Sequence, residues 1–194
     1  MGARDVILVA GPPCSGKSFV VNRLRSGNLP HLEHALLGAR LEDWSFVYAG
    51  NLPADPDEGR FVAQYDFLKQ WKRDPLTWCY GKDPSLRGLR TAQHGVIVTV
   101  YAPMPALLTR VRERRRRLLV HALTHPFLLK RDYRELLETH RLLGLYTMLD
   151  PFSLYHRWFE FSKGHCAEHW VLEYDGQRFS LSAAGEWENR QFVP

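Results

Sequence analysis

The sequence contains few cysteines and no long apolar run. Cys14, Cys79 and Cys166 are the only cysteines in 194 residues, an odd and widely spaced set that predicts no disulfide framework. His165, Cys166 and His169 together offer three metal ligands, one fewer than a structural zinc site needs. No apolar stretch approaches the roughly 18 residues of a membrane-spanning helix, and the first residues lack the apolar segment of a secretory signal. These absences predict no membrane insertion and leave the cytoplasm as the expected compartment.

Positive charge is concentrated in one segment. The net charge is +5, and the segment from Arg110 to Arg117 has arginine at six of its eight positions. Such a local excess predicts a polyanionic partner, either the phosphates of a nucleotide or a nucleic-acid backbone. A solvated basic helix face is the simpler interpretation, and composition alone leaves both open.

Alternating strand and helix patterns predict an α/β fold in a single domain, residues 1–194. Apolar and β-branched runs predict strands at 6–10, 44–49, 60–67, 95–101 and 169–174. Helical spacing predicts helices after Lys17, over 31–40, over 84–93, from Pro103 onward, over 132–145 with Asp132 as N-cap, and over 152–161. We expect a mainly parallel five-stranded sheet with helices on both faces, followed by a hairpin that turns at Asp175-Gly176 into 178–181.

The strongest motif lies between the first strand and the first helix. Residues Gly11 to Ser18 read Gly-Pro-Pro-Cys-Ser-Gly-Lys-Ser, a full match to the phosphate-loop pattern G-x-x-x-x-G-K-[ST]. Its glycines allow the backbone to turn N–H groups inward, and the following helix adds the positive end of its dipole. Lys17 would reach the β- and γ-phosphates, and the Ser18 hydroxyl would ligate Mg²⁺. The residues predicted to contact the nucleotide are Gly11, Pro13, Cys14, Ser15, Gly16, Lys17 and Ser18.

With this loop, the sheet pattern and the arginine-rich segment, the chain resembles the P-loop NTPase superfamily and, within it, the adenylate-kinase-like and shikimate-kinase-like small kinases. The resemblance implies ATP and Mg²⁺ as cofactors and a helical lid at about residues 115–130. It also implies that Arg110 stacks near the adenine and that Arg114 touches phosphates, while Arg131 and Arg141 look like a second arginine pair after the lid. We therefore expect Arg114 and Arg131 to act in catalysis and Arg110 and Arg141 to bind the nucleotide. Converging guanidinium groups would stabilise the charge that spreads over the phosphoryl oxygens during transfer.

Asp66 ends the third predicted strand. A carboxylate at the carboxyl edge of a strand beside the phosphate loop would face Mg²⁺ or a substrate hydroxyl, and the resemblance implies an acidic residue of the Mg²⁺ shell at this place. An ordinary loop aspartate that caps the next segment is the alternative. Asp66 lacks the following glycine and arginine with which monophosphate kinases of this family hold their second nucleotide, so we expect a different acceptor site.

These features predict an ATP-dependent phosphotransferase that acts on an unidentified small acceptor such as a sugar or nucleoside. A polynucleotide kinase acting on DNA or RNA is one alternative, favoured by the basic segment. A nucleotide-dependent binding module without phosphotransfer is another. The choice of ATP over GTP rests on the resemblance, since no base-reading N-K-x-D motif is present.

Overall fold

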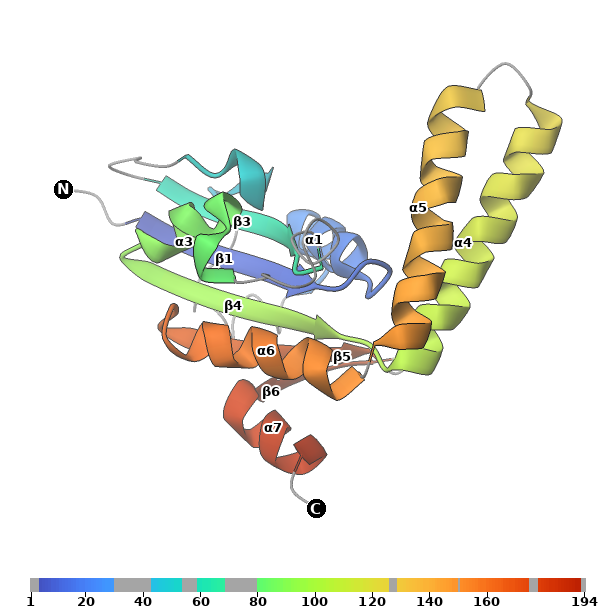
Figure 1. Ribbon diagram of the computed structural model, residues 1–194. Coiled ribbons are helices and arrows are strands. Elements are labelled where there is room, and N and C mark those ends of the chain that lie inside the picture. The colour runs from blue at the N-terminus through green and yellow to red at the C-terminus, as the bar shows by residue number, and fades with distance from the viewer. Residues whose placement is uncertain are drawn as a thin grey trace. The chain divides into compact units, whose positions relative to one another are not determined.

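The computed structural model describes residues 4–29, 43–53, 59–68, 80–125, 129–149, 151–174 and 178–192. The chain divides into two compact units, one formed by Met1–Tyr101 with Arg157–Pro194 and the other by Ala102–His156. The first unit contains a β-sheet and the second contains a pair of long helices (Figure 1). The segment 115–130, predicted to be a lid, belongs to the helical unit.

Six strands form one sheet. They are β1 (Arg4–Gly11), β2 (Ser45–Tyr48), β3 (Gly59–Asp66), β4 (His94–Tyr101), β5 (Glu168–Tyr174) and β6 (Phe179–Ala183). Their order is β2-β3-β1-β4-β5-β6, with β1 to β5 parallel and β6 antiparallel to β5. Ile7, Leu8 and Val9 of the central β1 are fully buried. Burial on both faces explains the continuous apolar run of this strand.

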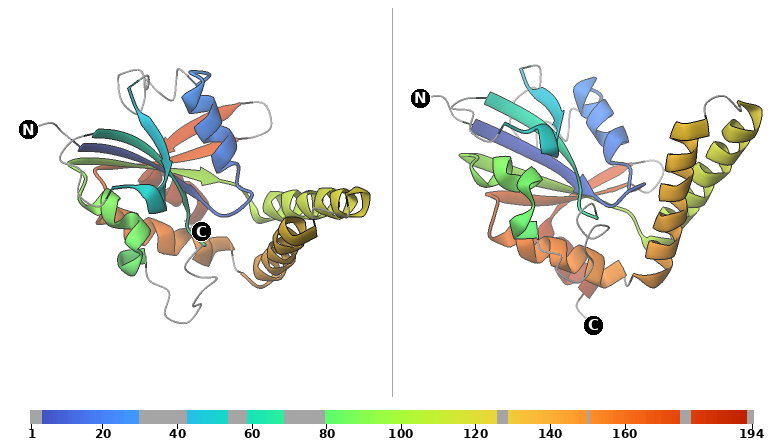
Figure 2. Two further views of the ribbon diagram at one scale, coloured as in Figure 1. Left: turned by 90° about the horizontal axis from the view of Figure 1, so that it is seen from above. Right: turned by 45° about the horizontal axis from the view of Figure 1, so that its top comes forward.

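Helix α1 (Lys17–Arg25) covers one face of the sheet, as Figure 2 shows. Its side chains Val20, Val21 and Leu24 are buried in a cluster with Ile7 and Val9 of β1. Because successive side chains of a strand point to opposite faces, the odd-numbered residues of β1 meet α1 and the even-numbered ones face the other side. The opposite face carries α3 (Arg87–Arg90), the second half of α6 (Pro151–Lys163) and α7 (Ala184–Phe192).

Trp158 of α6 is the centre of packing on this second face. It is fully buried, and its ring stacks on those of Tyr65 and Phe67, each at a centroid distance of 5.4 Å. The Tyr65 hydroxyl donates a 2.6 Å hydrogen bond to the buried carboxylate of Asp83. Burial, together with this carboxylate, raises the pKa of Tyr65 well above its ordinary value, so the phenol stays a donor. The contacts join α6 to the end of β3.

The helical unit consists mainly of α4 (Met104–Thr124) and α5 (Leu129–Met148), which pack against each other. Leu107 and Val111 of α4 and Leu142 of α5 are buried apolar side chains. Arg114 Nη2 lies 3.2 Å from Glu135 Oε2 across the pair, with side chains 42% and 31% exposed. Such an exposed ion pair contributes at most about 1 kcal/mol, so apolar packing holds the helices together.

The predicted strands are confirmed. Each of the five parallel strands begins and ends within two residues of its predicted range. The hairpin strand β6 joins the same sheet, which therefore has six strands rather than five. The turn predicted at Asp175-Gly176 lies outside the described residues.

The helices were predicted less accurately. The N-cap predicted at Asp132 is wrong, because α5 already begins at Leu129 and the good helix formers Leu-Lys-Arg extend it. The helix predicted over 84–93 is a 3-10 turn, Pro84–Leu86, followed by the single turn of α3. Helix α7 was not predicted, and the helix predicted over 31–40 lies outside the described residues.

A network of hydrogen bonds links α6, β4 and β5 on the face of the sheet that carries α6. Trp158 Nε1 donates to Thr99 Oγ1 at 2.8 Å, and Thr99 Oγ1 lies 2.7 Å from His169 Nε2. Ser162 Oγ donates to the Phe159 carbonyl and lies 2.6 Å from His169 Nδ1. Since the serine proton is already committed to that carbonyl, Nδ1 donates to Ser162. Burial lowers the pKa of His169 to about 3, so the ring is neutral and Nε2 accepts from Thr99. This hydrogen-bond network therefore contains a neutral imidazole.

We predict that His169 makes folding stability depend on pH. Burial lowers its pKa to about 3, against an ordinary value of 6.5, so the unfolded chain takes up a proton first as the pH falls. The stabilisation is present above pH 6.5 and is lost toward pH 3, by about 2 kcal/mol between pH 6.5 and 4.5. Denaturant unfolding of the parent and His169→Gln at several pH values measures this loss. The slope of unfolding free energy against pH should flatten in His169→Gln. It should persist in the control His94→Gln, which replaces an exposed histidine. Equal slopes in the parent and both variants would contradict the assignment.

Candidate functional site

The phosphate loop connects the end of β1 to the start of α1. β1 lies between β3 and β4, and the chain leaves β1 toward β2 but leaves β4 toward β5. The carboxyl ends of β1 and β4 are thus the point where the strand order reverses. In open α/β sheets, ligands bind in the crevice outside such a point.

Backbone geometry at three loop residues is specific. Cys14 and Gly16 have positive φ angles of 65° and 108°. Residues in left-handed conformations within a turn direct successive N–H groups to one side, which forms an anion-binding nest. At Gly11 the constraint is space, since a Cβ there would lie 2.7 Å from Ser15 Oγ and 2.9 Å from the Val100 carbonyl oxygen. Glycine at position 11 therefore lets the loop run against β4.

The first turn of α1 has the features of an anion site. Gly16 caps the helix without a side-chain hydrogen bond, and no acidic residue occupies the first turn. The first N–H groups of a helix have no intrahelical acceptor, and the dipole makes this end positive. Lys17 is buried, and its Nζ donates a 2.7 Å hydrogen bond to the Pro12 carbonyl oxygen. The ammonium group is thereby held against the loop, where a phosphate would bind.

Gln64 is a residue of the site that the sequence did not single out. Its Nε2 donates to Ser18 Oγ at 3.0 Å and so orients the hydroxyl predicted to ligate Mg²⁺. Gln64 precedes Asp66 by two positions on β3, so both side chains lie on the face that carries α1. This period-two spacing is the signal that could have identified Gln64.

Asp66 ends β3 directly beside Gly11, with which it is paired in register. Its Oδ1 accepts a 3.0 Å hydrogen bond from the Leu68 amide, which is the capping role foreseen as the alternative. A carboxylate can accept about four such contacts, so this bond does not exhaust its capacity for Mg²⁺. The position of Asp66 fits both roles, and the catalytic one stays a prediction.

The predicted arginines belong to the helical unit. Arg110 and Arg114 are half-buried on α4, and Arg141 is exposed on α5. Arg114 forms an ion pair with Glu135, a structural contact that the sequence did not indicate. Arg131 lies in the first turns of α5, and its side chain is outside the described residues. Roles for these four residues at a nucleotide stay predictions.

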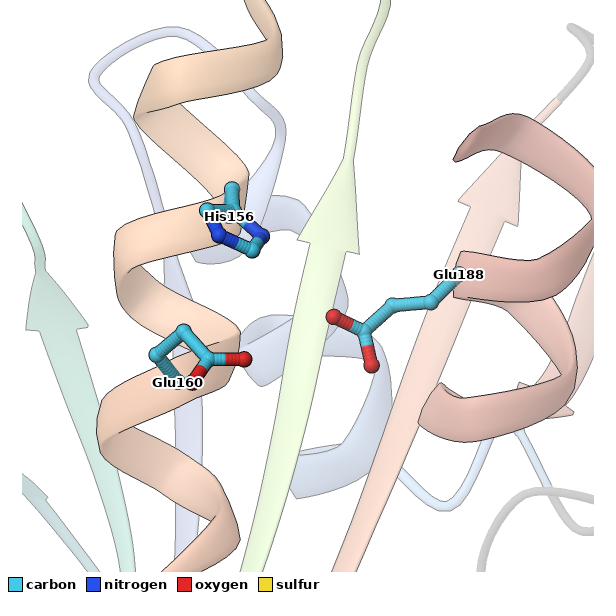
Figure 3. A group of neighbouring side chains, drawn as sticks. All are labelled: His156, Glu160 and Glu188. Atoms are coloured by element: carbon cyan, nitrogen blue, oxygen red, sulfur yellow. The ribbon is translucent and has the colours of Figure 1, made fainter. Parts of the chain in front are cut away.

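Two carboxylates of the first unit, on α6 and α7, lie close together. Figure 3 shows the carboxylates of Glu160 in α6 and Glu188 in α7 turned toward each other, with His156 one helical turn before Glu160. Lys163 Nζ lies 2.7 Å from Glu160 and 3.3 Å from Glu188. The hydrogen bond to Glu160 raises the pKa of Lys163, so the ammonium stays charged and forms ion pairs with both carboxylates.

The His165, Cys166 and His169 side chains each make a separate contact within the protein. His165 Nδ1 is hydrogen-bonded to the Phe161 carbonyl, and Cys166 Sγ donates to the Ser162 carbonyl. His169 belongs to the hydrogen-bond network with Thr99 and Ser162. Burial raises the pKa of Cys166 to about 11, which keeps it a thiol. Each side chain thus has its own structural partner.

No protein-family model matches the chain, and no match was found among curated proteins or solved structures. None of the helices in the described part of the chain combines the length and the apolar character needed to cross a bilayer. A function for the chain therefore rests on its own residues.

We predict opposite effects of alanine at two glycines. Gly11→Ala should lower the free energy of unfolding by about 1–3 kcal/mol, because the new Cβ meets the Val100 backbone, which cannot rotate away. Gly144→Ala, in the exposed interior of α5 with nothing within 4 Å of its Cβ, should raise it by up to about 1 kcal/mol. Denaturant unfolding of both variants tests the pair. A Gly11→Ala protein as stable as its parent would show that the loop is not constrained by β4.

Proposed function

We propose that this chain is an ATP-dependent phosphotransferase that acts on a small acceptor such as a sugar or nucleoside. The observation that carries the proposal is the geometry of Gly11–Ser18: left-handed angles at Cys14 and Gly16, a glycine without room for a side chain, and an uncapped helix end behind them. Together these features support the binding of a polyphosphate by backbone amides and Lys17.

Two side chains near the loop fit Mg²⁺. The Ser18 hydroxyl is exposed and oriented by Gln64, and the Asp66 carboxylate stands beside Gly11 on the neighbouring strand. Hydroxyl and carboxylate oxygens are ligands that Mg²⁺ accepts together with waters and phosphates. Ser18 and Asp66 would hold the ion, which would supply positive charge to the phosphates. The γ-phosphoryl group would pass from ATP to an acceptor hydroxyl, leaving ADP, and the hydroxyl proton would be released to solvent.

One observation favours the alternative of a nucleotide-dependent binding module. The Asp66 carboxylate has a structural partner in the Leu68 amide, so its presence at the strand end does not require catalysis. Binding and transfer therefore need separate experiments. A screen of sugars, nucleosides and oligonucleotides with labelled ATP, scored for label transfer, would identify the acceptor.

We predict that Lys17→Met weakens ATP binding by about 10–100-fold, the effect of losing a charge-assisted hydrogen bond. Methionine preserves the buried stem of the side chain, so the fold should be unchanged. Isothermal titration with MgATP measures the affinity, and Lys82→Met, at an exposed lysine, is the control. Unchanged ATP affinity in Lys17→Met would contradict the proposed site.

We predict that Asp66→Asn lowers the phosphotransfer rate by about 100-fold, because the charge toward Mg²⁺ is lost. The asparagine side-chain oxygen can still accept the hydrogen bond from the Leu68 amide, so the melting temperature of Asp66→Asn should equal that of the parent. Asp66→Ala should lose both transfer and about 1 kcal/mol of stability. If phosphotransfer survives in Asp66→Asn and only Asp66→Ala is destabilised, the role of Asp66 is structural: it caps the following turn through the Leu68 amide.

A further inference from the structure

The two units differ sharply in charge. Residues 102–156 contain ten lysines and arginines against five aspartates and glutamates, whereas the rest of the chain contains 16 of each. The whole net charge of +5 therefore belongs to the helical unit, and the unit with the phosphate loop is formally neutral. A single nucleotide at the loop gives no reason for this separation.

The excess is displayed on the exposed surface of α4, where the arginines cover about 200° of the helix circumference; we call this surface the arginine face. It consists of Arg112, Arg115, Arg116 and Arg117, all exposed. Within the described part of the chain, no carboxylate forms an ion pair with any of these four guanidinium groups. Their charge is available to a partner, unlike that of Arg114, which pairs with Glu135.

Apolar side chains share this exposed side. Leu119, Val120 and Leu123 are 40%, 55% and 83% exposed. At 100° per residue they fall with Arg112 and Arg116 within about 100° of arc, opposite the buried Leu107 and Val111. Arginine and apolar contacts would therefore meet the same partner.

A groove runs along the edge of this face. It has a volume of about 530 Å³ and is lined by Glu113, Arg116, Arg117, Val120, His121 and Thr124. The His121 ring stacks on that of His125 at a centroid distance of 4.6 Å and an interplanar angle of 16°, and both residues are exposed. Flat rings beside arginines offer stacking surfaces to nucleobases.

We propose that the arginine face of α4 binds single-stranded nucleic acid, a function beyond nucleotide binding at the loop. Guanidinium groups pair with phosphate oxygens through two parallel hydrogen bonds, and the apolar and imidazole groups contact bases, whose faces a single strand exposes. A duplex presents mainly phosphates and would leave Val120 and Leu123 in water. A membrane-surface helix needs its charged and apolar residues on opposite faces, whereas on α4 they share one, because the other face packs against α5.

The test is fluorescence anisotropy of a labelled oligothymidylate titrated with the full chain. An oligonucleotide of about 20 nucleotides spans the site sizes usual for single-strand binding. Four neutralised phosphates predict a log–log salt slope of about −2.8, which is roughly a 50-fold loss of affinity from ~50 to ~200 mM salt. Replacing Arg112, Arg115, Arg116 and Arg117 with glutamine should abolish that slope and most of the binding. Glutamine keeps helix propensity, and circular dichroism would verify the fold.

The matched control replaces four exposed cationic residues of the neutral unit, Arg23, Arg25, Lys82 and Arg87, with glutamine. It removes the same charge and should leave oligothymidylate binding within about threefold of the parent, since salt-dependent affinity follows the contacts made and not net charge alone. Titration of MgATP into both variants separates the two sites: the arginine-face variant should bind ATP normally even if it has lost the oligonucleotide.

Several results would overturn the proposal. These are no binding of oligothymidylate at low salt, an equal loss in the control variant, or equal competition by a duplex of the same length. Binding to phosphatidylserine vesicles through the arginine face, without oligonucleotide binding, would assign the face to a membrane surface instead.

Discussion

The parallel pairing of β1 with β3 on one side and β4 on the other is the constraint on which the candidate site depends. It brings the carboxyl ends of three strands to one edge, so that Gly11, Asp66 and the Val100 carbonyl oxygen become neighbours although they are far apart in the sequence. The close approach of the loop to β4 excludes a side chain at position 11. The loop then passes through left-handed angles at Cys14 and Gly16 to enter α1, a path of the kind that turns N–H groups to one side in anion nests.

The two faces of the sheet support this edge in different ways. The α1 face is an aliphatic cluster that fixes the helix whose first turn bears Lys17 and Ser18. The opposite face combines the stacked ring of Trp158 with a hydrogen-bond chain through Thr99, His169 and Ser162. Buried polar groups of this kind are costly unless every member has a partner, and here the neutral imidazole satisfies both neighbours. The positions of β4 and β5 are therefore tied to the protonation state of one ring.

Net charge differs between the two units of the chain. The unit with the predicted phosphate loop is neutral overall, and its candidate site offers backbone amides, a helix end and one lysine. The helical unit holds the excess arginine, partly used in the Arg114–Glu135 pair and partly displayed on α4. If both sites operate, a nucleotide and a longer polyanion would be bound by physically different means, local dipoles in one case and exposed guanidinium groups in the other.

Much of the fold could be predicted because its signals are local. Continuous β-branched runs identify buried parallel strands, and a glycine-rich loop between a strand and a helix indicates a phosphate site. By itself the sequence thus determined five strand positions, the loop Gly11–Ser18 and the placement of Asp66 at a strand end. Only the tertiary structure decided the contacts that depend on strand order and helix packing: the Gln64 bond to Ser18, the second role of Asp66 at Leu68 and the pairing of Arg114 with Glu135. These contacts join residues whose closeness arises from neighbouring strands or packed helices, and no local pattern encodes which strands become neighbours.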